Sequence, residues 1–364
     1  MLRLPCFVRR TILRLAEDIG IDLGTATFLI YTKSRGLVLK EPSVIAMTRD
    51  TRQVKAVGEE AYRMLGRTPA GIVVVRPVRD GVIADENLTE KMISMFLQKI
   101  HKGQGSGSRF MSLGGFKPQM MIGVPSNTSD VEKRAVARAA LNAGARRAYL
   151  IEEPLAAAIG AGLNVLEPLG SMVVDIGGGS TDIAVISLGG IVVSESVRVA
   201  GDEFDESIMR YVRRKHRVLI GERTAEEIKM KLGAAIVFDE AENVIAEIRG
   251  RDLQTGLPRS ITLNTSNIVE ALLEPVGKII EATRRVLEIT PPELVGDIVD
   301  RGIVMTGGGS LLRNFDELMR QSTGIPVTVP EHTVETVAIG TGMALDMIPE
   351  LGDSLVCSDS YLRR

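Results

Sequence analysis

Two aspartates precede glycine-containing turns at matching places in the chain. Asp22 lies in IGIDLGTATFLIY, at residues 19–31, and Asp175 lies in MVVDIGGGSTDIAVI, at residues 172–186. Such turns between strands expose backbone N–H groups that can bind phosphate. Each aspartate stands in an apolar strand, where an unpaired carboxylate is costly, and a divalent cation shared with phosphates would offset that cost. One such turn alone favours a structural hairpin, whereas the matched pair predicts a magnesium–nucleotide site.

The remaining reactive side chains favour few other chemistries. The chain has two distant cysteines and three widely spaced histidines: Cys6, Cys357, His101, His216 and His332. These residues can form neither a four-ligand zinc site nor a disulfide framework, and they fit Cys/His catalysis poorly. The chain contains no GxxxxGK[ST] motif, which excludes a P-loop enzyme. The glycine-rich stretch 103–108 neither follows a predicted strand nor opens a helix, which argues against a dinucleotide fingerprint.

Length and composition indicate a folded protein of about two domains. The chain has 364 residues, of which 45% are hydrophobic and 25% are charged. This is the profile of an ordinary folded chain with a substantial core. Its 44 basic and 46 acidic residues give a formal net charge of −2, which argues against nucleic acid as a partner. The chain has no run of about 18 apolar residues, so no membrane-spanning helix is predicted.

The elements that must hold the two aspartates alternate between strands and helices. The strand–turn–strand patterns at 19–31 and 172–186 suggest two related halves, and a third glycine turn follows a strand at 303–311. Ser129 and Glu132 form the pattern of a capping box at the start of a helix. Strands mixed with helices along the whole chain indicate an α/β fold. The other expected elements are strands at 120–124 and 148–151 and helices at 89–100, 129–144 and 154–162.

Together these motifs resemble those of one superfamily. The chain is similar to actin, hexokinase and heat-shock ATPases, and within that superfamily it resembles the MreB family of bacterial actin homologues. The resemblance extends from about Asp18 to about Ile348. It rests on the segments GIDLGTA, EPSVIA, GRTP, RPVRDGVIAD, GVPS, IEEPLAAAIGAGL, MVVDIGGGSTD, AGDEFDE, IGERTAEEIK, DRGIVMTGGGSLLRN and AIGTG.

The resemblance implies an actin-like (ribonuclease H-like) α/β fold. Two duplicated domains would flank a nucleotide cleft, and each domain would carry a smaller subdomain. The expected boundaries are 1–165 for domain I, with a small subdomain at about 46–78 and an N-terminal amphipathic segment at 2–16; 166–336 for domain II, with a small subdomain at about 204–267; and 337–364 for the return to domain I and the C-terminal tail.

The resemblance also places an ATP and magnesium site residue by residue. Asp22 and Asp175 would hold magnesium through water, and Glu153, immediately before Pro154, would be the catalytic residue that orients the attacking water. Glu152 is the weaker candidate, and without the resemblance this acidic pair would simply favour the helix dipole. The expected nucleotide-binding residues lie in the three glycine turns and in the second small subdomain: Gly24, Thr25, Ala26, Thr27, Gly177, Gly178, Gly179, Ser180, Thr181, Gly201, Asp202, Glu226, Lys229, Gly307, Gly308, Gly309, Ser310 and Leu311.

Some of these residues have a simpler interpretation or depart from the family. Glu226 and Lys229 lie one helical turn apart, which alone favours a solvated salt bridge, whereas the resemblance implies contact with the ribose and base. Thr27 stands where family members typically have asparagine, and Ser180 and Asp182 stand where threonine and glutamate are typical. We expect nucleotide binding to be retained and the hydrolysis rate to be the property most affected.

Two segments are candidate membrane anchors. The N-terminal segment has a basic face and an apolar face, as in helices that lie in a membrane interface, although a helix packed on the body or an unused upstream start codon would also explain it. The loop near 110–116 alone favours a flexible linker, and the resemblance implies that it inserts into the membrane. Two weak anchors per subunit would gain avidity along a filament. The expected membrane residues are Leu4, Val8, Ile12, Leu15, Phe110, Met111, Leu113 and Phe116.

The function implied by the resemblance is that of an ATP-binding, slowly hydrolysing cytoskeletal protein. It would form filaments, as antiparallel double protofilaments, at the cytoplasmic face of the inner membrane and direct cell-wall synthesis and rod shape with the cell-wall elongation machinery. The alternatives are a non-polymerising ATPase of the same superfamily, of chaperone type or sugar-kinase type, and a filament subunit that barely hydrolyses ATP. The chain offers no substrate-binding domain after residue 350, which counts against the chaperone type.

Overall fold

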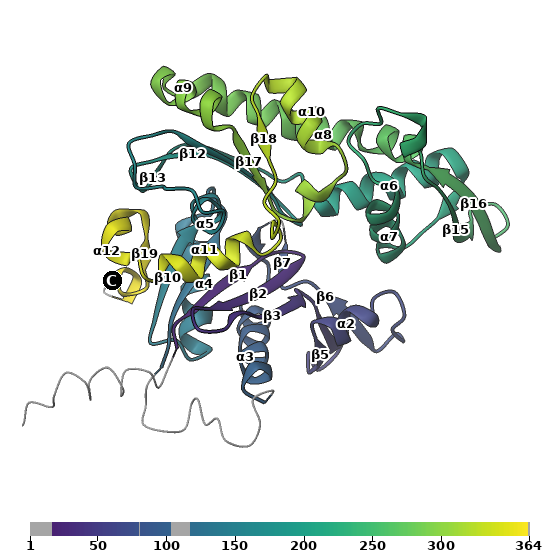
Figure 1. The fold of residues 1–364 in the computed structure, drawn as a ribbon. Helices are drawn as coiled ribbons and strands as arrows, with labels where there is room; N and C mark the ends of the chain where they lie inside the picture. Colours follow the sequence, from purple (N-terminus) through teal and green to yellow (C-terminus); the bar gives the residue numbers. More distant parts are fainter. Residues whose placement is uncertain (1–16, 80, 103–116, 363–364) are drawn as a thin grey trace, which may run out of the picture.

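The computed structural model describes residues 17–79, 81–102 and 117–362. Two large sheets face each other across a middle layer formed by α5 (Glu153–Gly160) and α11 (Thr336–Ala344), and other helices cover their outer faces (Figure 1). The protein is therefore built of five layers, in the order helices, sheet, helices, sheet, helices. The predicted α/β class is confirmed.

The first large sheet contains the hairpin that carries Asp22. Its strand order is β19 (Val356–Cys357), β10 (Arg147–Glu152), β9 (Gln119–Val124), β1 (Ile19–Leu23), β2 (Thr27–Thr32) and β3 (Gly36–Pro42). Strand β1 pairs antiparallel with β2 and parallel with β9. Helices α3 (Glu86–Lys102) and α4 (Asp130–Asn142) pack on its outer face. The predicted capping box is present at α4, where the Ser129 N–H donates to Glu132 Oε2 at 2.8 Å.

The second large sheet contains the hairpin that carries Asp175. Its order is β13 (Gly190–Val197), β12 (Thr181–Ser187), β11 (Ser171–Ile176), β17 (Ile303–Thr306) and β18 (Val327–Thr328). Strand β11 pairs antiparallel with β12 and parallel with β17, which repeats the arrangement around β1. The helices of this half are α6 (Gly201–His216), α7 (Glu222–Leu232), α8 (Thr265–Ile289), α9 (Pro292–Arg301), α10 (Phe315–Thr323) and the short η3 (Gly308–Leu311).

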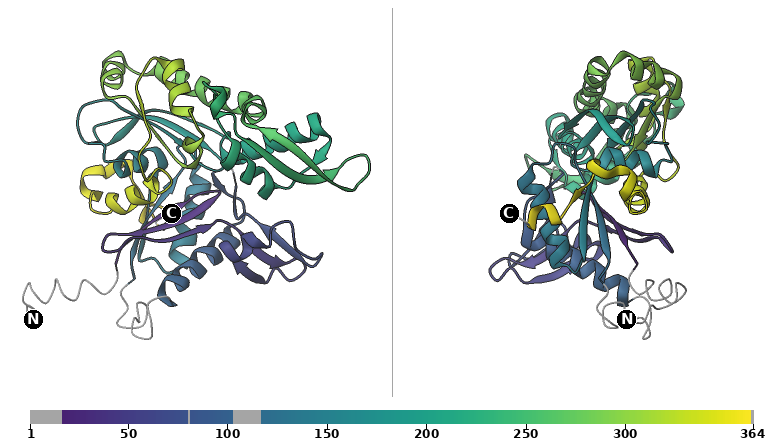
Figure 2. Two further views of the ribbon diagram at one scale, coloured as in Figure 1. Left: turned by 45° about the vertical axis from the view of Figure 1, so that its right-hand side comes forward. Right: turned by 90° about the vertical axis from the view of Figure 1, so that its left-hand side faces the viewer.

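Each half also carries a small three-stranded sheet, and both sheets project from the same side of the molecule (Figures 1 and 2). The first consists of β5 (Val54–Val57), β4 (Ile45–Thr48) and β6 (Ile72–Val75) with α2 (Glu59–Arg63), and the second of β14 (Val218–Leu219), β15 (Ile245–Asp252) and β16 (Pro258–Asn264). The remaining elements are β7 (Val78–Arg79), β8 (Val82–Ile83), η2 (Glu240–Glu242), α12 (Ile348–Leu351), η4 (Gly352–Ser354) and α13 (Asp359–Leu362).

Strand alternation directs both aspartates toward the middle layer. In β1, Ile19, Ile21 and Leu23 belong to the outer core beneath α3 and α4, so Asp22 points the other way. In β11, Met172, Val174 and Ile176 join the outer core of the second half, so Asp175 also points inward. The period of two along each strand therefore places both carboxylates between the sheets.

The middle layer is held by backbone contact between two helices. A Cβ built at Gly160 of α5 would lie 1.9 Å from the Thr336 carbonyl oxygen, and one at Gly340 of α11 would lie 1.8 Å from that of Ala156. Only glycine fits at these positions. No helix within the described ranges is long and apolar enough to cross a bilayer.

Candidate functional site

The glycine turn after Asp22 and the glycine turn after Asp175 meet between the two large sheets. The first turn follows Asp22 and contains Ala26, and the second follows Asp175 and contains Gly178. A Cβ built at Gly178 would lie 2.6 Å from the Ala26 Cβ, so the second turn has no room for a side chain there. Turns that the sequence separates widely therefore lie side by side, with their backbones facing the same space.

Four carboxylates gather at these turns. Asp22, Glu153, Asp175 and Asp182 are contributed by β1, α5, β11 and β12. Asp175 and Asp182 are directly opposite in the β11–β12 hairpin, so their side chains share one face of the sheet. Like charges facing each other across a hairpin are unfavourable without a compensating cation. The cluster therefore has the composition of a cation-binding site.

Burial raises the pKa values of all four groups, and the negative charge of neighbouring carboxylates raises them further. Burial, followed by the charge of Asp175, raises the pKa of Asp22 from its ordinary value of 3.8 to about 8. Burial raises the pKa of Asp175 to about 7, although the hydrogen bond from Thr306 opposes this. Burial also raises the pKa values of Glu153 and Asp182. A cation beside the cluster would favour the charged form of every one of them.

Two of the four carboxylates, Asp175 and Asp182, are oriented by hydrogen bonds from neighbouring groups. The Thr306 hydroxyl donates to Asp175 Oδ1 at 2.9 Å, and the Ser126 N–H donates to Asp182 Oδ1 at 3.0 Å. The second of these bonds joins the end of β9 in one half to β12 in the other. Glu153 is buried at the first residue of α5. The Asp175 and Asp182 carboxylates are therefore held in fixed directions beside the second turn.

These residues fit a magnesium ion held through water. Within the described part of the chain, no three His, Cys, Asp or Glu side chains are close enough to bind a metal directly. Magnesium commonly keeps several waters and is shared between one or two carboxylates and substrate phosphates. The buried carboxylates offer negative charge to such a cation. The backbone at Gly178, where no side chain fits, leaves the turn open to a phosphate.

The predicted hydroxyls of the turns have different surroundings. Thr25 is buried and its Oγ1 accepts a hydrogen bond from the Gly81 N–H at 3.0 Å. The Thr181 hydroxyl donates to the Val199 carbonyl oxygen at 2.6 Å and is fully buried, so it supports the strand rather than the turn. Ser180 lies beside Asp182, to which its side chain is hydrogen-bonded.

The predicted nucleoside contacts lie next to the second turn. The N–H groups of Gly201 and Asp202 donate to the carbonyl oxygens of Gly177 and Gly178 at 3.2 and 2.7 Å. Lys229 donates to the Gly201 carbonyl oxygen at 3.0 Å and to Asp205 Oδ2 at 2.8 Å. Spacing alone favours a salt bridge between Glu226 and Lys229. In the structure Glu226 instead accepts a hydrogen bond from the Tyr62 hydroxyl, and Lys229 pairs with Asp205.

The third glycine turn packs directly against the second. Gly307 has φ of +80°, and a Cβ there would lie 2.3 Å from the Ile176 carbonyl oxygen. A Cβ built at Gly309 would lie 2.3 Å from the Ile176 side chain, whereas one built at Gly308 would have no atom within 4 Å. Leu311 is 60% exposed, and Ser310 is buried with its hydroxyl donating to the Gly307 carbonyl oxygen at 2.7 Å. Gly308 and Leu311 are therefore the members of this turn that are free to contact a ligand.

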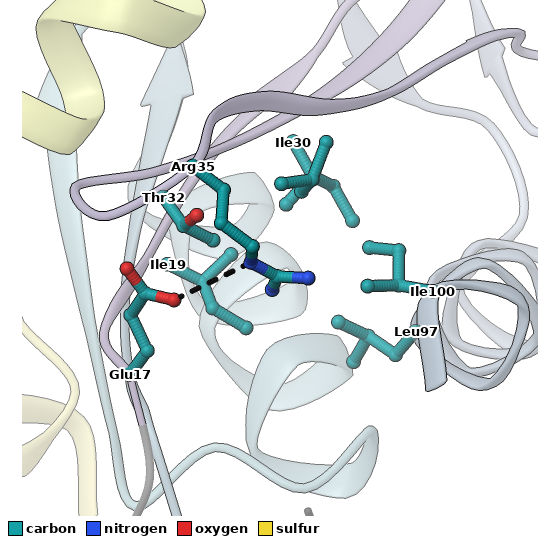
Figure 3. A pocket seen from close by; sticks show the side chains of 8 residues that line it. Glu17, Ile19, Ile30, Thr32, Arg35, Leu97 and Ile100 are labelled. Atoms are coloured by element: carbon teal, nitrogen blue, oxygen red, sulfur yellow. Dashed lines mark ion pairs between the residues drawn. The ribbon is translucent and has the colours of Figure 1, made fainter. Parts of the chain in front are cut away.

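Two small pockets lie outside the turns themselves. The one in Figure 3 lies at the opposite end of the β1–β2 hairpin from Asp22, where Arg35 reaches over apolar side chains to within 3.7 Å of Glu17. Its lining contains none of the predicted site residues: Glu17, Ile19, Ile30, Thr32, Arg35, Val38, Leu97 and Ile100. The second pocket adjoins Glu153 and is lined by residues that include Gly81, Gly123 and Thr128.

Sequence reasoning missed several residues of the site and could not test others. It treated Asp182 only as a departure from the family, although an acidic residue opposite Asp175 in a predicted hairpin signals a fourth carboxylate. It did not single out Tyr62, Asp205 or Arg76, whose partners are distant in sequence. Tyr62 donates to Glu226, Asp205 accepts from Lys229, and Arg76 donates to the Thr25 carbonyl oxygen at 3.4 Å. The predicted membrane residues all lie outside the described part of the chain: Leu4, Val8, Ile12, Leu15, Phe110, Met111, Leu113 and Phe116.

Comparison with known sequences gives consistent matches over nearly the whole chain. A model of the MreB/Mbl protein family matches residues 16–353. The chain is 51% identical over 337 residues to the cell shape-determining protein Mbl of Bacillus subtilis (strain 168), a match that covers 92% of this chain and 98% of that protein. It is 52% identical over 344 residues to the cell shape-determining protein MreB of Escherichia coli (strain K12), covering 93% and 96%.

Comparison with solved structures identifies the same fold. MreB5 of Spiroplasma citri bound to AMPPNP superimposes with a TM-score of 0.84 and 35% identity, covering 92% of this chain and 97% of that one. A MamK double helical filament superimposes with a TM-score of 0.73 at 21% identity, covering 90% and 98%, and therefore supports the fold alone. The predicted actin-like fold is confirmed.

Proposed function

This chain belongs to the MreB/Mbl family, and on that premise we propose that it is a cytoskeletal subunit that binds ATP with magnesium, assembles into filaments and determines cell shape. The observation that carries the proposal is the identity of about half of all aligned residues to two cell shape-determining proteins, over more than nine-tenths of both chains in each case. A nucleotide analogue is bound in the related MreB5 structure, which supports ATP as the ligand here.

The phosphates of ATP would lie between the two turns. Backbone N–H groups of residues 24–27 and 177–181 would bind them, as glycine turns bind phosphate elsewhere. Asp22 and Asp175 would hold the hydrated magnesium, which when bound supplies positive charge beside the phosphates. The raised pKa values of both aspartates, caused mainly by burial, support this role, because a bound cation would favour their charged forms.

Glu153 would act on the attacking water. Its position at the first residue of α5, beside Asp22, Asp175 and Asp182, places a carboxylate next to both turns. That carboxylate would orient the water and accept its proton as the water oxygen bonds to the terminal phosphorus and the bond to the ADP leaving group breaks. Burial, followed by the neighbouring carboxylates, raises the pKa of Glu153, so compensation of the nearby negative charge would favour the ionised form that this role needs.

The nucleoside would lie against the second half of the molecule. Glu226 and Lys229 on α7, with Gly201 and Asp202 at the start of α6, would contact the ribose and base. Gly308 and Leu311 would close over the adenine, because both are open to solvent. Lys229 is already hydrogen-bonded to Asp205, so its ammonium group has a fixed position before any ligand binds.

Filaments would form beneath the membrane. We propose that subunits associate as antiparallel double protofilaments, that segments 2–16 and 110–116 contact the inner-membrane surface, and that the cell-wall elongation machinery is the partner. A head-to-tail contact that does not close produces an open filament, and repetition along it strengthens weak anchors by avidity. The protein would then be cytoplasmic and peripheral at the membrane.

Electron microscopy on lipid monolayers tests the proposal. We expect ordered filaments with magnesium-ATP and none without nucleotide. The Asp175→Ala variant should form no filaments under either condition, whereas Asp346→Ala, which changes an exposed partner of Lys33, should behave like the unmodified chain. Deletion of residues 2–14 should weaken flotation with liposomes while filaments still form in solution. The absence of filaments with every nucleotide would instead favour a non-polymerising ATPase.

The role of Glu153 has a separate test. Glu153→Ala should slow phosphate release by about 100-fold or more, in the range found for removal of a general base, while ATP binding is retained. An unchanged release rate would remove Glu153 from the mechanism but leave the filament proposal intact.

A further inference from the structure

A hydrogen bond joins α2, beside the first small sheet, to α7 in the other half of the molecule. The Tyr62 hydroxyl on α2 donates to Glu226 Oε2 on α7, across 164 residues of sequence. Helices α2 and α7 face each other on the side from which both small sheets project (Figures 1 and 2). This bond ties the half that carries Asp22 to the half that carries Asp175.

Tyr62 has a fixed position in the first small sheet. Its ring packs against the core formed by Val44, Ala46, Ala56 and Ala61. The helix that carries it is anchored at its start, where the Glu59 N–H donates to Glu41 Oε2 at 2.8 Å. The hydroxyl is therefore directed outward from a rigid base toward the other half.

Glu226 is connected to the second phosphate turn. One helical turn further along α7, Lys229 donates to the Gly201 carbonyl oxygen at 3.0 Å. The Gly201 N–H in turn donates to the Gly177 carbonyl oxygen at 3.2 Å. A short series of hydrogen bonds thus runs from the helix that carries Glu226 to the backbone of the phosphate turn.

The surroundings of Tyr62 keep its hydroxyl protonated, as the hydrogen bond to Glu226 requires. Burial, followed by the hydrogen bond to Glu226, raises the pKa of Tyr62 well above its ordinary value, so the phenol stays neutral and remains a donor. Arg76 and Arg223 lie near enough to oppose that change. Arg76 also donates to the Thr25 carbonyl oxygen at 3.4 Å, which links the same region to the first turn.

We propose that Tyr62 is a positioning residue that clasps Glu226 across the two halves and so slows the release of bound nucleotide. This inference rests on the proposed role of Glu226 at the ribose. A nucleotide bound by both turns contacts both halves, which meet where Gly178 lies against Ala26, so separation of the halves favours its release. Separation must break the Tyr62–Glu226 bond, which therefore adds to the barrier for release.

Dissociation of a fluorescent ATP analogue from the full chain, chased with unlabelled magnesium-ATP, tests the clasp. Tyr62→Phe keeps the ring in its core and removes only the donor. We expect it to speed release about 3- to 10-fold, the range that corresponds to the net contribution of one typical hydrogen bond. The matched control is Tyr211→Phe, which removes a 2.9 Å hydrogen bond to Glu270 within the second half and should leave release unchanged.

Two further measurements separate a clasp from a general loss of stability. If Tyr62 acts through Glu226, the double variant Tyr62→Phe/Glu226→Ala should release nucleotide no faster than Glu226→Ala alone. Spin labels at the exposed positions Glu60 and Glu227, in a chain with Cys6→Ser and Cys357→Ser, should report a longer and broader distance in Tyr62→Phe than in the parent.

Each outcome decides between the inference and the function on which it rests. Equal release from Tyr62→Phe and the unmodified chain would overturn the clasp and leave nucleotide binding intact. Equal acceleration by Tyr62→Phe and Tyr211→Phe would also overturn it, because the effect would not depend on a bond between the halves. Failure of the unmodified chain to bind the analogue would overturn both the proposed function and the clasp.

Discussion

The β1–β2 and β11–β12 hairpins carry the same pattern in different surroundings. Each places an aspartate one residue before the end of its first strand, followed by a glycine turn. Asp175 receives a hydrogen bond from Thr306, its register partner on β17. On β9, the residue after the Ile122 that pairs with Ile21 is Gly123, which has no side chain to donate. Burial and then the charge of Asp175 raise the pKa of Asp22 to about 8, against a backbone hydrogen bond from Gly24, and burial raises the pKa of Asp175 to about 7, against the bond from Thr306.

This difference shows that repeating a motif does not repeat its electrostatics. The carboxylate and the turn come from the repeated hairpin, whereas some of the groups that surround the carboxylate come from the neighbouring parallel strand. Asp22 is the less stabilised of the two anions, so it should depend more on a bound cation than Asp175 does. Variants at equivalent positions of the two hairpins test whether the hairpins differ in this way.

The largest effect is expected from removing either aspartate. Asp22→Ala and Asp175→Ala should each weaken magnesium-dependent ATP binding by about 100-fold or more, which corresponds to about 2.8 kcal/mol. Titration calorimetry with and without magnesium measures this loss, with Asp346→Ala as an exposed control. If one variant binds normally, only the other hairpin holds the cation.

The second effect is a fall in stability of the nucleotide-free protein as the pH rises. The pKa values of Asp22 and Asp175 are higher in the folded chain than their ordinary value of 3.8, so their contribution is full below about pH 4 and is lost by about pH 8. The Tm should therefore be higher at pH 5 than at pH 8. Asp22→Asn should flatten this slope more than Asp175→Asn, because the pKa of Asp22 is displaced further.

Circular dichroism is the suitable method for that measurement, since the chain has no tryptophan. Magnesium-ATP should reduce the difference in Tm between pH 5 and pH 8 by compensating the charges. A Tm that rises from pH 5 to pH 8 in the nucleotide-free protein would contradict the assignment of repelling carboxylates.

A smaller difference is expected between the first glycines of the two turns. A Cβ at Gly24 would lie 2.7 Å from the Thr27 carbonyl oxygen, whereas one at Gly177 would lie 3.3 Å from that of Ser180. Gly24→Ala should therefore reduce the free energy of unfolding by about 1–3 kcal/mol. Gly177→Ala should cost less than about 1 kcal/mol, because a shift of a few tenths of an ångström suffices. Urea denaturation compares the two, and a larger loss for Gly177→Ala would reverse the ranking.

The smallest effect should come from making the second hairpin resemble the first. Thr306→Val removes the donor to Asp175 while keeping the volume of the buried side chain. We expect magnesium-ATP to bind about 3- to 10-fold more weakly, the range that corresponds to the net contribution of one typical hydrogen bond. The pH at which stability is lost should also move upward toward that set by Asp22. An unaltered pH profile would mean that Thr306 does not control the acidity of Asp175.

Local patterns predicted much of the fold and the core of the site. The two hairpins, the capping box at Ser129 and the strand ending at Val124 all arise from neighbouring residues, and all are present. Alternation along β1 and β11 accounts for the inward direction of Asp22 and Asp175. The boundaries of the domains and the nucleotide contacts stay predictions.

Contacts between distant segments could not be predicted in the same way. The residues around Tyr62 form no motif that indicates a partner. Only the packing of the two halves brings its hydroxyl to Glu226. The series from Glu226 through Lys229 to Gly177 likewise depends on how α6 meets the second turn. Such contacts depend on the relative placement of whole sheets, about which a local sequence window contains no information.

The order of the chain has a consequence for synthesis on the ribosome. The first sheet is completed by β19, and its middle-layer partner α11 lies near the end of the chain. At about 5–20 residues per second, roughly 10–40 s pass between the emergence of α5 and that of β19. During that interval the nascent chain exposes the edge of β10 and the apolar face of α5, both targets for non-native pairing. Chaperones that protect nascent chains would therefore matter most between these two events.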